Sequence, residues 1–198
     1  MKYIFYITGK SASGKDSIYR ELLSDKTLNL NPLILHTTRP KRDGETDDME
    51  YHFVDEGIYQ DMKKKGEVIE CRTYDTMHGP WRYFTSSSAV ETDKDFYLGI
   101  GTLESFRGLK DYFGADSLIP LYIEVEDGDR LIRAIEREKL SNKPDYREMC
   151  RRYIADDEDF SELRLQEADI DTHNRFENRN LTDCISDIRS MIIGYQSK

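Results

Sequence analysis

The sequence predicts an α/β fold in which a parallel sheet carries helices on both faces. First, an apolar run at residues 3–7 leads into a glycine-containing loop and then a helical pattern at residues 16–24. Second, strand-like and helix-like segments alternate again from residue 96 to the end of the chain. Third, residues 35–90 contain several short strands and one helix, so we expect a small lobe inserted into the main sheet.

The glycine-containing loop follows the spacing of a phosphate-binding loop. Gly9 and Gly14 allow the backbone to curl until several N–H groups converge, and the following helix adds its partial positive charge. Lys15 is expected to reach the outer phosphates of a nucleotide. The alternative is a glycine- and serine-rich turn between a strand and a helix. The residues expected to hold the phosphates are Gly9, Lys10, Ser11, Ala12, Ser13, Gly14, Lys15, Asp16 and Ser17.

Short strands dominate the segment that we expect to form the inserted lobe. A helix is expected to begin after Asp55 and to end near Gly66, because Asp55 is a typical N-cap residue. Gly79 and Pro80 indicate a turn between the last two strands. The expected strands cover residues 33–35, 50–54, 68–74 and 81–85.

The second half of the chain alternates strands and helices. Pro144 separates two expected helices, because proline disrupts a helix interior. The expected strands are 96–100, 118–125 and 168–172, and the expected helices are 103–112, 129–139, 145–160 and 181–193.

Length and charge limit the function classes. The 198 residues, 1–198, suit one domain, and a net charge of −10 argues against broad attraction to nucleic acid. Positive charge gathers locally at residues 39–42 and 130–152, as a nucleotide site would require. Three scattered cysteines without metal spacing, no apolar run of membrane-spanning length and no cleavage site suggest a cytoplasmic protein without membrane contact. Nothing in the sequence indicates the oligomeric state.

A basic turn lies between the first two strands of the expected lobe. Arg39 and Arg42 are three residues apart, hydroxyl groups lie beside them, and Tyr51 follows. Guanidinium groups fork onto phosphate oxygens, so this pattern suits a phosphate monoester. Taken alone, the segment also fits a solvated basic loop.

The string T-T-R-P-K-R-D-G-E at residues 37–45, followed by E-Y-H-F-V, resembles the guanylate kinase family. The resemblance is strongest over residues 7–55. It implies a P-loop NTPase core, a nucleoside monophosphate-binding lobe at about 35–90 and a helical lid at about 130–155. It also implies transfer of the γ-phosphate of ATP to GMP, giving GDP and ADP, with Mg²⁺ as the metal.

The resemblance also implies roles for individual residues. The implied contacts to GMP are Thr38, Arg39, Arg42, Glu45, Tyr51, Glu70, Tyr83 and Thr85. The implied catalytic residues are Lys15, Arg133, Arg137 and Arg152, and Asn174 is the implied contact to adenine.

The chemistry of Glu70 fits the role that the resemblance implies, which is a contact to the guanine base of GMP. Guanine presents N1–H and an exocyclic amine on one edge, and a single carboxylate can accept both. Adenine has an acceptor at N1, which a carboxylate would repel. The alternative is a glutamate on the solvated face of an edge strand, because Ile69 and Cys71 point the other way.

The expected lid carries arginines at helical spacing. Arg130, Arg133 and Arg137 recur at i, i+3 and i+7, so they share one helix face. Phosphoryl transfer depends on in-line positioning and on positive charge around the transferred group, which such arginines can supply. The alternative is a helix surface covered by ion pairs with neighbouring acidic residues.

Four positions, in three places, depart from the family pattern. Leu35 replaces a serine, Gly99 and Gly101 replace acidic residues, and Asp16 replaces the loop hydroxyl that normally binds magnesium. We hypothesise that the lost acidic charge has moved to Asp16, which would then be a metal ligand. The alternative is that Asp16 caps the helix.

These departures leave two other functions open. One is a kinase for another nucleoside or deoxynucleoside monophosphate. The other is a protein-binding module that has kept the fold, which the intact Gly9, Gly14 and Lys15 disfavour.

Overall fold

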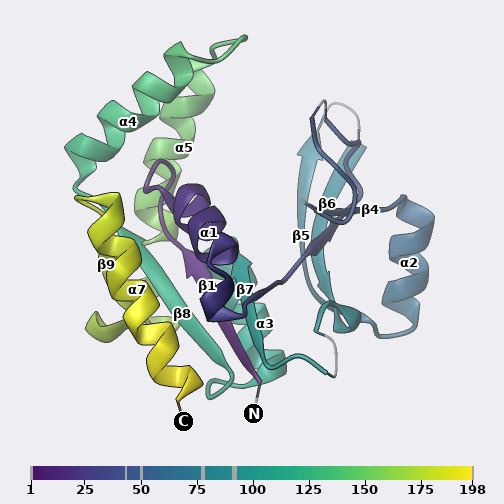
Figure 1. Cartoon of the computed structure of the whole chain (residues 1–198). Helices are drawn as coiled ribbons and strands as arrows, with labels where there is room; N and C mark the ends of the chain where they lie inside the picture. The colour runs from purple at the N-terminus through teal and green to yellow at the C-terminus, as the bar shows by residue number, and fades with distance from the viewer. Residues whose placement is uncertain (1, 43, 50, 77–78, 91–92, 198) are drawn as a thin grey trace.

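The computed structural model describes residues 2–42, 44–49, 51–76, 79–90 and 93–197. The main sheet has five parallel strands in the order β2-β7-β1-β8-β9 (Figure 1). Strand β1 lies in the middle, and its carboxyl end leads directly into the glycine-containing loop. The strands are β1 (Tyr3–Thr8), β2 (Asn31–Pro32), β7 (Phe96–Ile100), β8 (Leu118–Glu124) and β9 (Arg175–Glu177).

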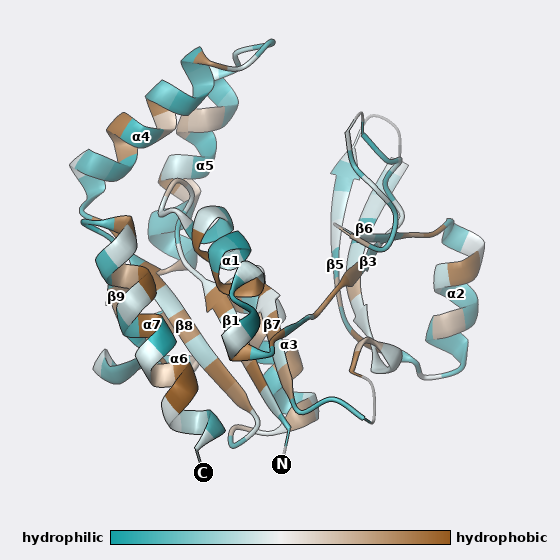
Figure 2. Ribbon diagram, in the orientation of Figure 1, coloured by the Kyte–Doolittle hydropathy of each residue, from teal (hydrophilic) through white to brown (hydrophobic). Residues whose placement is uncertain are grey.

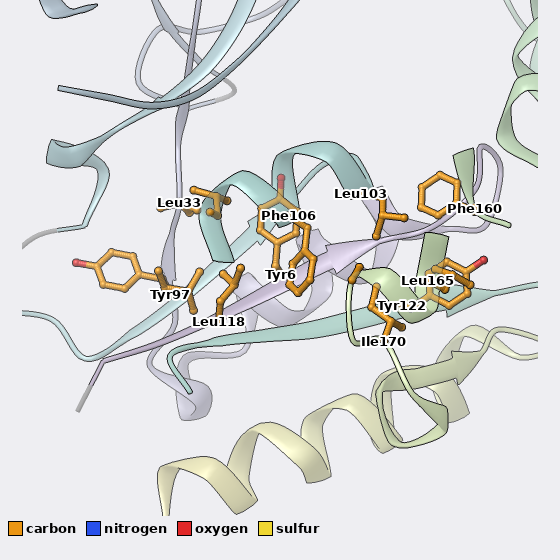
Figure 3. Packing of buried hydrophobic residues seen from close by; sticks show 13 residues of the cluster. Tyr6, Leu33, Tyr97, Leu103, Phe106, Leu118, Tyr122, Phe160, Leu165 and Ile170 are labelled. Atoms are coloured by element: carbon orange, nitrogen blue, oxygen red, sulfur yellow. The ribbon is translucent and has the colours of Figure 1, made fainter. Parts of the chain in front are cut away.

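Alternate residues of β1 pack into two different cores, one on each face of the sheet. Phe5 and Ile7 belong to the core under α1 (Lys15–Ser24) and α7 (Leu181–Gln196). Ile4 and Tyr6 belong to the core under α3 (Leu103–Phe113) and α6 (Glu162–Glu167), which Figure 3 shows. The continuous apolar run of β1 is therefore that of a strand buried on both sides, as parallel sheets require.

A second sheet of four strands forms the lobe beside the main sheet, in the order β4-β3-β6-β5 (Figure 1). Its strands are less apolar than those of the main sheet (Figure 2). One face packs against α2, where the ring of Phe84 stacks on His36 and meets Tyr59. The elements are β3 (Leu35–Thr37), β4 (Tyr51–Phe53), α2 (Glu56–Lys64), β5 (Val68–Thr76) and β6 (Gly79–Ser86).

Two helices, α4 (Asp127–Lys139) and α5 (Tyr146–Asp159), form a pair that projects beyond the carboxyl end of the main sheet (Figure 1). Each starts at an acidic residue, Glu126 or Asp145, whose side chain accepts a backbone N–H of the first turn. Short 3₁₀ turns cover Lys26–Leu28, Ser87–Ala89 and Thr172–Asn174. No described helix is long and apolar enough to cross a membrane.

The strand expected at 33–35 is divided between the two sheets. The strand of the main sheet, β2, ends one residue before the expected range begins. Leu33 N–H still donates to the carbonyl of Leu98 in β7. Leu33 belongs to the main core, whereas Leu35 begins β3 of the lobe. The apolar run thus marks the crossing between sheets and not a single strand.

The strand expected at 168–172 was wrong. Helix α6 ends just before it, and Ile170 N–H donates to the carbonyl of Leu165 in a tight turn where Asp169 has φ 56°. Ala168 and Ile170 are buried because this turn folds them onto the core. Two buried residues separated by one exposed residue imitate strand alternation over such a short span.

The glycines at 99 and 101 have a packing cause that does not involve Asp16. Tyr6 is fully buried, and its hydroxyl lies 2.7 Å from the Ser105 hydroxyl. A Cβ at Gly99 would come 2.7 Å from Cδ2 of Tyr6, and a Cβ at Gly101 would collide with the Tyr6 hydroxyl. A carboxylate at either position is therefore incompatible with the Tyr6 ring, and the hypothesis of charge moved to Asp16 is not needed to explain the glycines.

We expect Gly101→Ala to lower the free energy of unfolding by about 1–3 kcal/mol, because the added methyl group overpacks a closed core. In a Tyr6→Phe background the loss should be smaller, since the colliding hydroxyl is gone. Urea unfolding of the two single variants and the double variant measures this coupling. An equal loss in both backgrounds would show that the hydroxyl is not what excludes the side chain.

Candidate active site

A cavity of about 990 Å³ lies where the glycine-containing loop, the second sheet, the start of α3 and helix α5 meet. Six cationic and five acidic side chains line it, so the cavity is slightly positive in a chain of net charge −10. The residues expected from sequence that line it are Gly9, Ser11, Lys15, Asp16, Tyr51, Tyr83 and Arg152.

The loop has the curled conformation that its glycines allow. Gly14 has φ 93° and Ala12 has φ 62°, both in the left-handed region. A side chain at Gly14 would also collide with the carboxamide of Asn178. That carboxamide donates to the carbonyl of Ser13 at 2.8 Å, and the backbone N–H of Asn178 donates to the carbonyl of Glu124 at the end of β8. Asn178 therefore holds the loop from behind, a role that sequence reasoning missed.

Lys15 lies at the start of α1, and its Nζ donates to the carbonyl of Lys10 at 2.8 Å. Burial lowers the pKa of Lys15 to about 8, although the carboxylates of Asp16 and Asp156 oppose the shift. A phosphate near Nζ would stabilise the ammonium form and raise this pKa again. Lys15 is therefore placed and tuned to prefer an anionic ligand.

Asp16 is exposed and lines the cavity beside Lys15. The helix cap is Gly14, with no side-chain cap hydrogen bond, so the capping alternative for Asp16 has no contact to support it. Within the described part of the chain the Asp16 carboxylate has no hydrogen-bond or ion-pair partner. An exposed, unengaged carboxylate next to a phosphate-binding loop fits the oxygen ligands that Mg²⁺ prefers.

Helices α4 and α5 are joined to the loop by a buried ionic network. Arg130 is fully buried, donates to Asp127 and Asp156, and stacks on the ring of Tyr153 at 3.8 Å. The Asp156 carboxylate also accepts the N–H of Ser11 at 2.8 Å. The network thus places an acidic side chain of α5 on an N–H group of the loop.

Further ion pairs join the same two helices to the loop. Lys10 Nζ lies 2.7 Å from Asp157 and 3.5 Å from Asp127. Arg130 Nη2 lies 3.3 Å from Asp157 as well. Lys10 is therefore engaged by these two helices, although sequence analysis assigned it only to phosphate.

The arginines expected on the lid are divided between the cavity and other contacts. Arg152 lines the cavity together with its neighbour Arg151, and both pair with Glu148. Arg133 instead donates to the carbonyl of Asn178 at 2.9 Å, and Arg137 is exposed outside the cavity lining. The three arginines of α4 that share a face by spacing thus have three different environments.

The basic turn is built around an ion pair. The guanidinium of buried Arg39 forks onto the Glu45 carboxylate at 2.7 and 2.6 Å, and its Nε donates to the Tyr83 hydroxyl at 3.1 Å. The hydrogen bonds from Arg39 lower the pKa of Glu45 to about 2. Arg42 is exposed, and its backbone N–H donates to the same carboxylate. Thr38 is used structurally, because its hydroxyl accepts the N–H of Arg82.

Glu70 and Thr85 are brought together on β5 and β6. They are paired across the ladder, and the Thr85 hydroxyl donates to the Glu70 carboxylate at 2.7 Å. The Glu70 side chain is only 7% exposed, so the alternative of a solvated glutamate is wrong. Gly108 of α3 leaves room for it, since a Cβ there would come 2.6 Å from Cβ of Glu70. Glu70 is not in the lining of the cavity, whereas Arg72, two residues further along, does line it.

Asn174 lies outside the lining of the cavity. Its carboxamide donates to the carbonyl of Pro120, in the middle of β8, at 3.1 Å. Asn178, four residues later, is the asparagine that reaches the loop. Sequence spacing alone does not distinguish the two, because the short β9 lies between them.

Comparison with known proteins identifies the family. The family model described as guanylate kinase matches residues 2–172. The chain is 38% identical over 90 residues to a guanylate kinase of Methylobacillus flagellatus, which covers 45% of this chain and 42% of that protein. It is 31% identical over 132 residues to a guanylate kinase of Aromatoleum aromaticum, covering 62% of this chain and 61% of that one. The matches thus span between about two fifths and three fifths of these relatives.

A solved structure supports the same fold. The crystal structure of guanylate kinase from Anaplasma phagocytophilum superposes with a TM-score of 0.68, covering 100% of this chain and 87% of that chain at 14% identity. At this identity the likeness concerns the fold. Because the family model matches most of its length, the chain belongs to the guanylate kinase family.

Proposed function

We propose that the protein transfers the γ-phosphate of ATP to GMP, giving ADP and GDP. The observation that carries the proposal is the single cavity that has a phosphate-binding loop on one wall and the polar face of the second sheet on the other. An oxygen of the GMP phosphate attacks the γ-phosphorus, and the bond from that phosphorus to the β-phosphate oxygen breaks. Both substrates must therefore meet in one space, with their phosphates toward each other.

The donor nucleotide would be held by the loop. Its N–H groups and the start of α1 offer partial positive charge, and Lys15 supplies a full charge that a phosphate would stabilise. We keep residues 9–17 as the proposed ATP contacts. Asn174 is a weaker proposal, because its carboxamide is engaged by Pro120 away from the cavity.

The acceptor would lie along the second sheet. Glu70 suits the N1–H and amine edge of guanine, and Thr85 orients its carboxylate. Tyr51 and Tyr83 line the cavity. The Tyr83 oxygen accepts from Arg39, which leaves its own O–H to donate to the GMP phosphate. Arg39, Arg42 and Thr38 complete the proposed phosphate end, and Glu45 holds the fork of Arg39 in place until phosphate competes for it.

Residues 130–155 are the proposed lid. Arg152 already lines the cavity, and Arg137, although outside the lining, lies near enough to Lys15 to help lower its pKa. Arg133 would reach the transferred phosphate only if it left the carbonyl of Asn178. Such charge is useful only when water is excluded, because a low dielectric strengthens each contact. The segment at 35–90 is the proposed monophosphate-binding lobe.

Mg²⁺ is the proposed metal, and Asp16 is the residue that would hold it. When bound, the ion would neutralise charge on the phosphates of ATP. The protein itself provides positioning through the loop, Lys15 and the two sheets.

A panel of nucleoside and deoxynucleoside monophosphates, tested with ATP in a coupled assay for ADP, tests this function. We expect kcat/KM for GMP to exceed that for AMP, UMP and CMP by at least about a hundredfold, since a mismatched base leaves buried polar groups unpaired. Comparable values for two or more bases would contradict guanine recognition. Absence of ADP formation with every acceptor would contradict a kinase.

Glu70→Gln should reduce kcat/KM for GMP by about ten- to hundredfold, because an amide N–H would face donor groups of guanine. ATP affinity, measured by calorimetry, should change little. Glu56→Gln is the matched control, since Glu56 pairs with Arg82 outside the cavity. Parallel losses in GMP and ATP binding would point to damaged folding and against base recognition.

Asp16→Ser should weaken the apparent magnesium affinity during turnover, because a hydroxyl replaces a charged ligand. ATP without metal should bind more tightly to the variant, since a carboxylate that repels the phosphates has been removed. Magnesium titration of the rate and calorimetry with ATP in chelator measure the two effects. An unchanged magnesium titration would exclude Asp16 as a metal ligand.

A further inference from the structure

The cavity wall contains a buried arginine that the proposed function has not used. Three cross-strand pairs lie on one face of the β5–β6 ladder, because paired residues of an antiparallel ladder share a face. Arg72 and Tyr83 form the middle pair. The flanking pairs are Glu70 with Thr85 and Tyr74 with Trp81. Arg72 is 8% exposed, yet it lines the cavity.

The guanidinium of Arg72 is only partly satisfied. Its Nη1 donates to the Thr102 hydroxyl at 3.3 Å. Its Nε lies 3.4 Å from Oε2 of Glu70, but the N–H is not aligned with that oxygen and has no hydrogen-bond partner among the described residues. An unmet N–H on a buried charge is costly unless a ligand supplies an acceptor.

The unpaired Nε is itself buried, and the part of the Arg72 side chain that lines the cavity places a cationic donor directly beside the Glu70 acceptor. Guanine presents the reverse order on its edge, with the O6 carbonyl next to N1–H. Arginine is also the side chain that most often reads O6 and N7 of guanine in nucleic acids. Resting on the proposed function, we propose that Arg72 donates to O6 of the GMP base while Glu70 accepts from N1–H and the exocyclic amine. Arg72 is then a specificity-determining residue for the 6-oxo group.

A phosphate is a poorer occupant of the same position. Any anion that accepts from the Arg72 guanidinium would also lie near the Glu70 carboxylate, whose Oε2 is 3.4 Å from Nε. The two negative groups would repel each other at short range in a poorly hydrated site. A neutral carbonyl accepts from the arginine without that repulsion. Adenine would instead present its 6-amino group to the arginine, so donor would face donor.

The test combines changes in the protein with changes in the base. Measure kcat/KM for GMP, 6-thio-GMP, 7-deaza-GMP and IMP with the wild type and with Arg72→Met. In the wild type, replacing O6 by the weakly accepting sulfur should cost about tenfold or more. In the methionine variant GMP should lose that advantage, so that GMP and 6-thio-GMP react nearly equally. The GMP-to-IMP ratio should stay the same, because the exocyclic amine belongs to Glu70.

Arg82→Met is the matched control. Arg82 lies on β6, points to the other side, and pairs with Glu56 over the ring of Tyr59. This variant should keep the wild-type preference for GMP over 6-thio-GMP. Thermal unfolding and calorimetry with ATP establish that each variant is folded, and Arg72→Gln replaces the methionine variant if the latter does not fold. The comparison of GMP with 6-thio-GMP in the wild type tests the proposal even if no variant folds. Equal kcat/KM values for the two substrates in the wild type would overturn the proposal.

Two further outcomes would also overturn it. If Arg72→Met lowers kcat/KM for GMP and 6-thio-GMP by the same factor, the arginine does not contact O6. If the variant binds guanosine as well as the wild type does but has lost affinity for GMP, Arg72 is a phosphate ligand. Failure of the proposed function is distinguishable, because a wild type that does not phosphorylate GMP at all fails before any variant is compared.

Discussion

The buried guanidinium of Arg130 is the contact on which the arrangement of the site depends. A fully buried charge must be paired, and Arg130 is paired with carboxylates from the start of α4 and the end of α5. One of these carboxylates, Asp156, also accepts the N–H of Ser11 in the loop. Arg130 therefore holds the carboxylate through which α5 contacts the loop, and removing it would leave the buried side of Asp156 without its cation beside the loop.

This network bears on how the loop meets a phosphate. The Asp156 carboxylate takes an N–H that a phosphate oxygen would also accept, and it lies near enough to Lys15 to oppose the lowering of that pKa. A bound phosphate would thus compete with the Asp156 carboxylate of α5 for the Ser11 N–H. A change at α5 that frees Ser11 N–H would also change the electrostatics around Lys15, so the helix pair and the loop cannot respond independently.

Local sequence patterns predicted the structural features that depend on residues close together in the chain. The strand, loop and helix at the N-terminus followed from glycine spacing and apolar runs, and the facing of Glu70 and Thr85 was consistent with strand alternation. Asn178 was missed because its contact with the loop joins residues 165 apart in sequence. Arg72 had a visible signal, since alternation places it on the face of Glu70, but its hydrogen bond to Thr102 joins residues 30 apart in sequence. The false strand at 168–172 arose because a turn buried two residues with the same period as a strand.

Tyr6 shows how one side chain in the main sheet reshapes the substrate side of the site. Its ring occupies the space above Gly99 and Gly101, so carboxylates cannot stand at the end of β7. The segment after β7 therefore meets Arg72 with the hydroxyl of Thr102, and glycines stand at positions 99 and 101. The glycines, the buried tyrosine and the half-satisfied arginine therefore form one consistent set. A bulky residue in the core excludes acidic side chains from positions 99 and 101, and among the described residues the carboxylate paired with Arg72 is that of Glu70, which is already shared with Thr85.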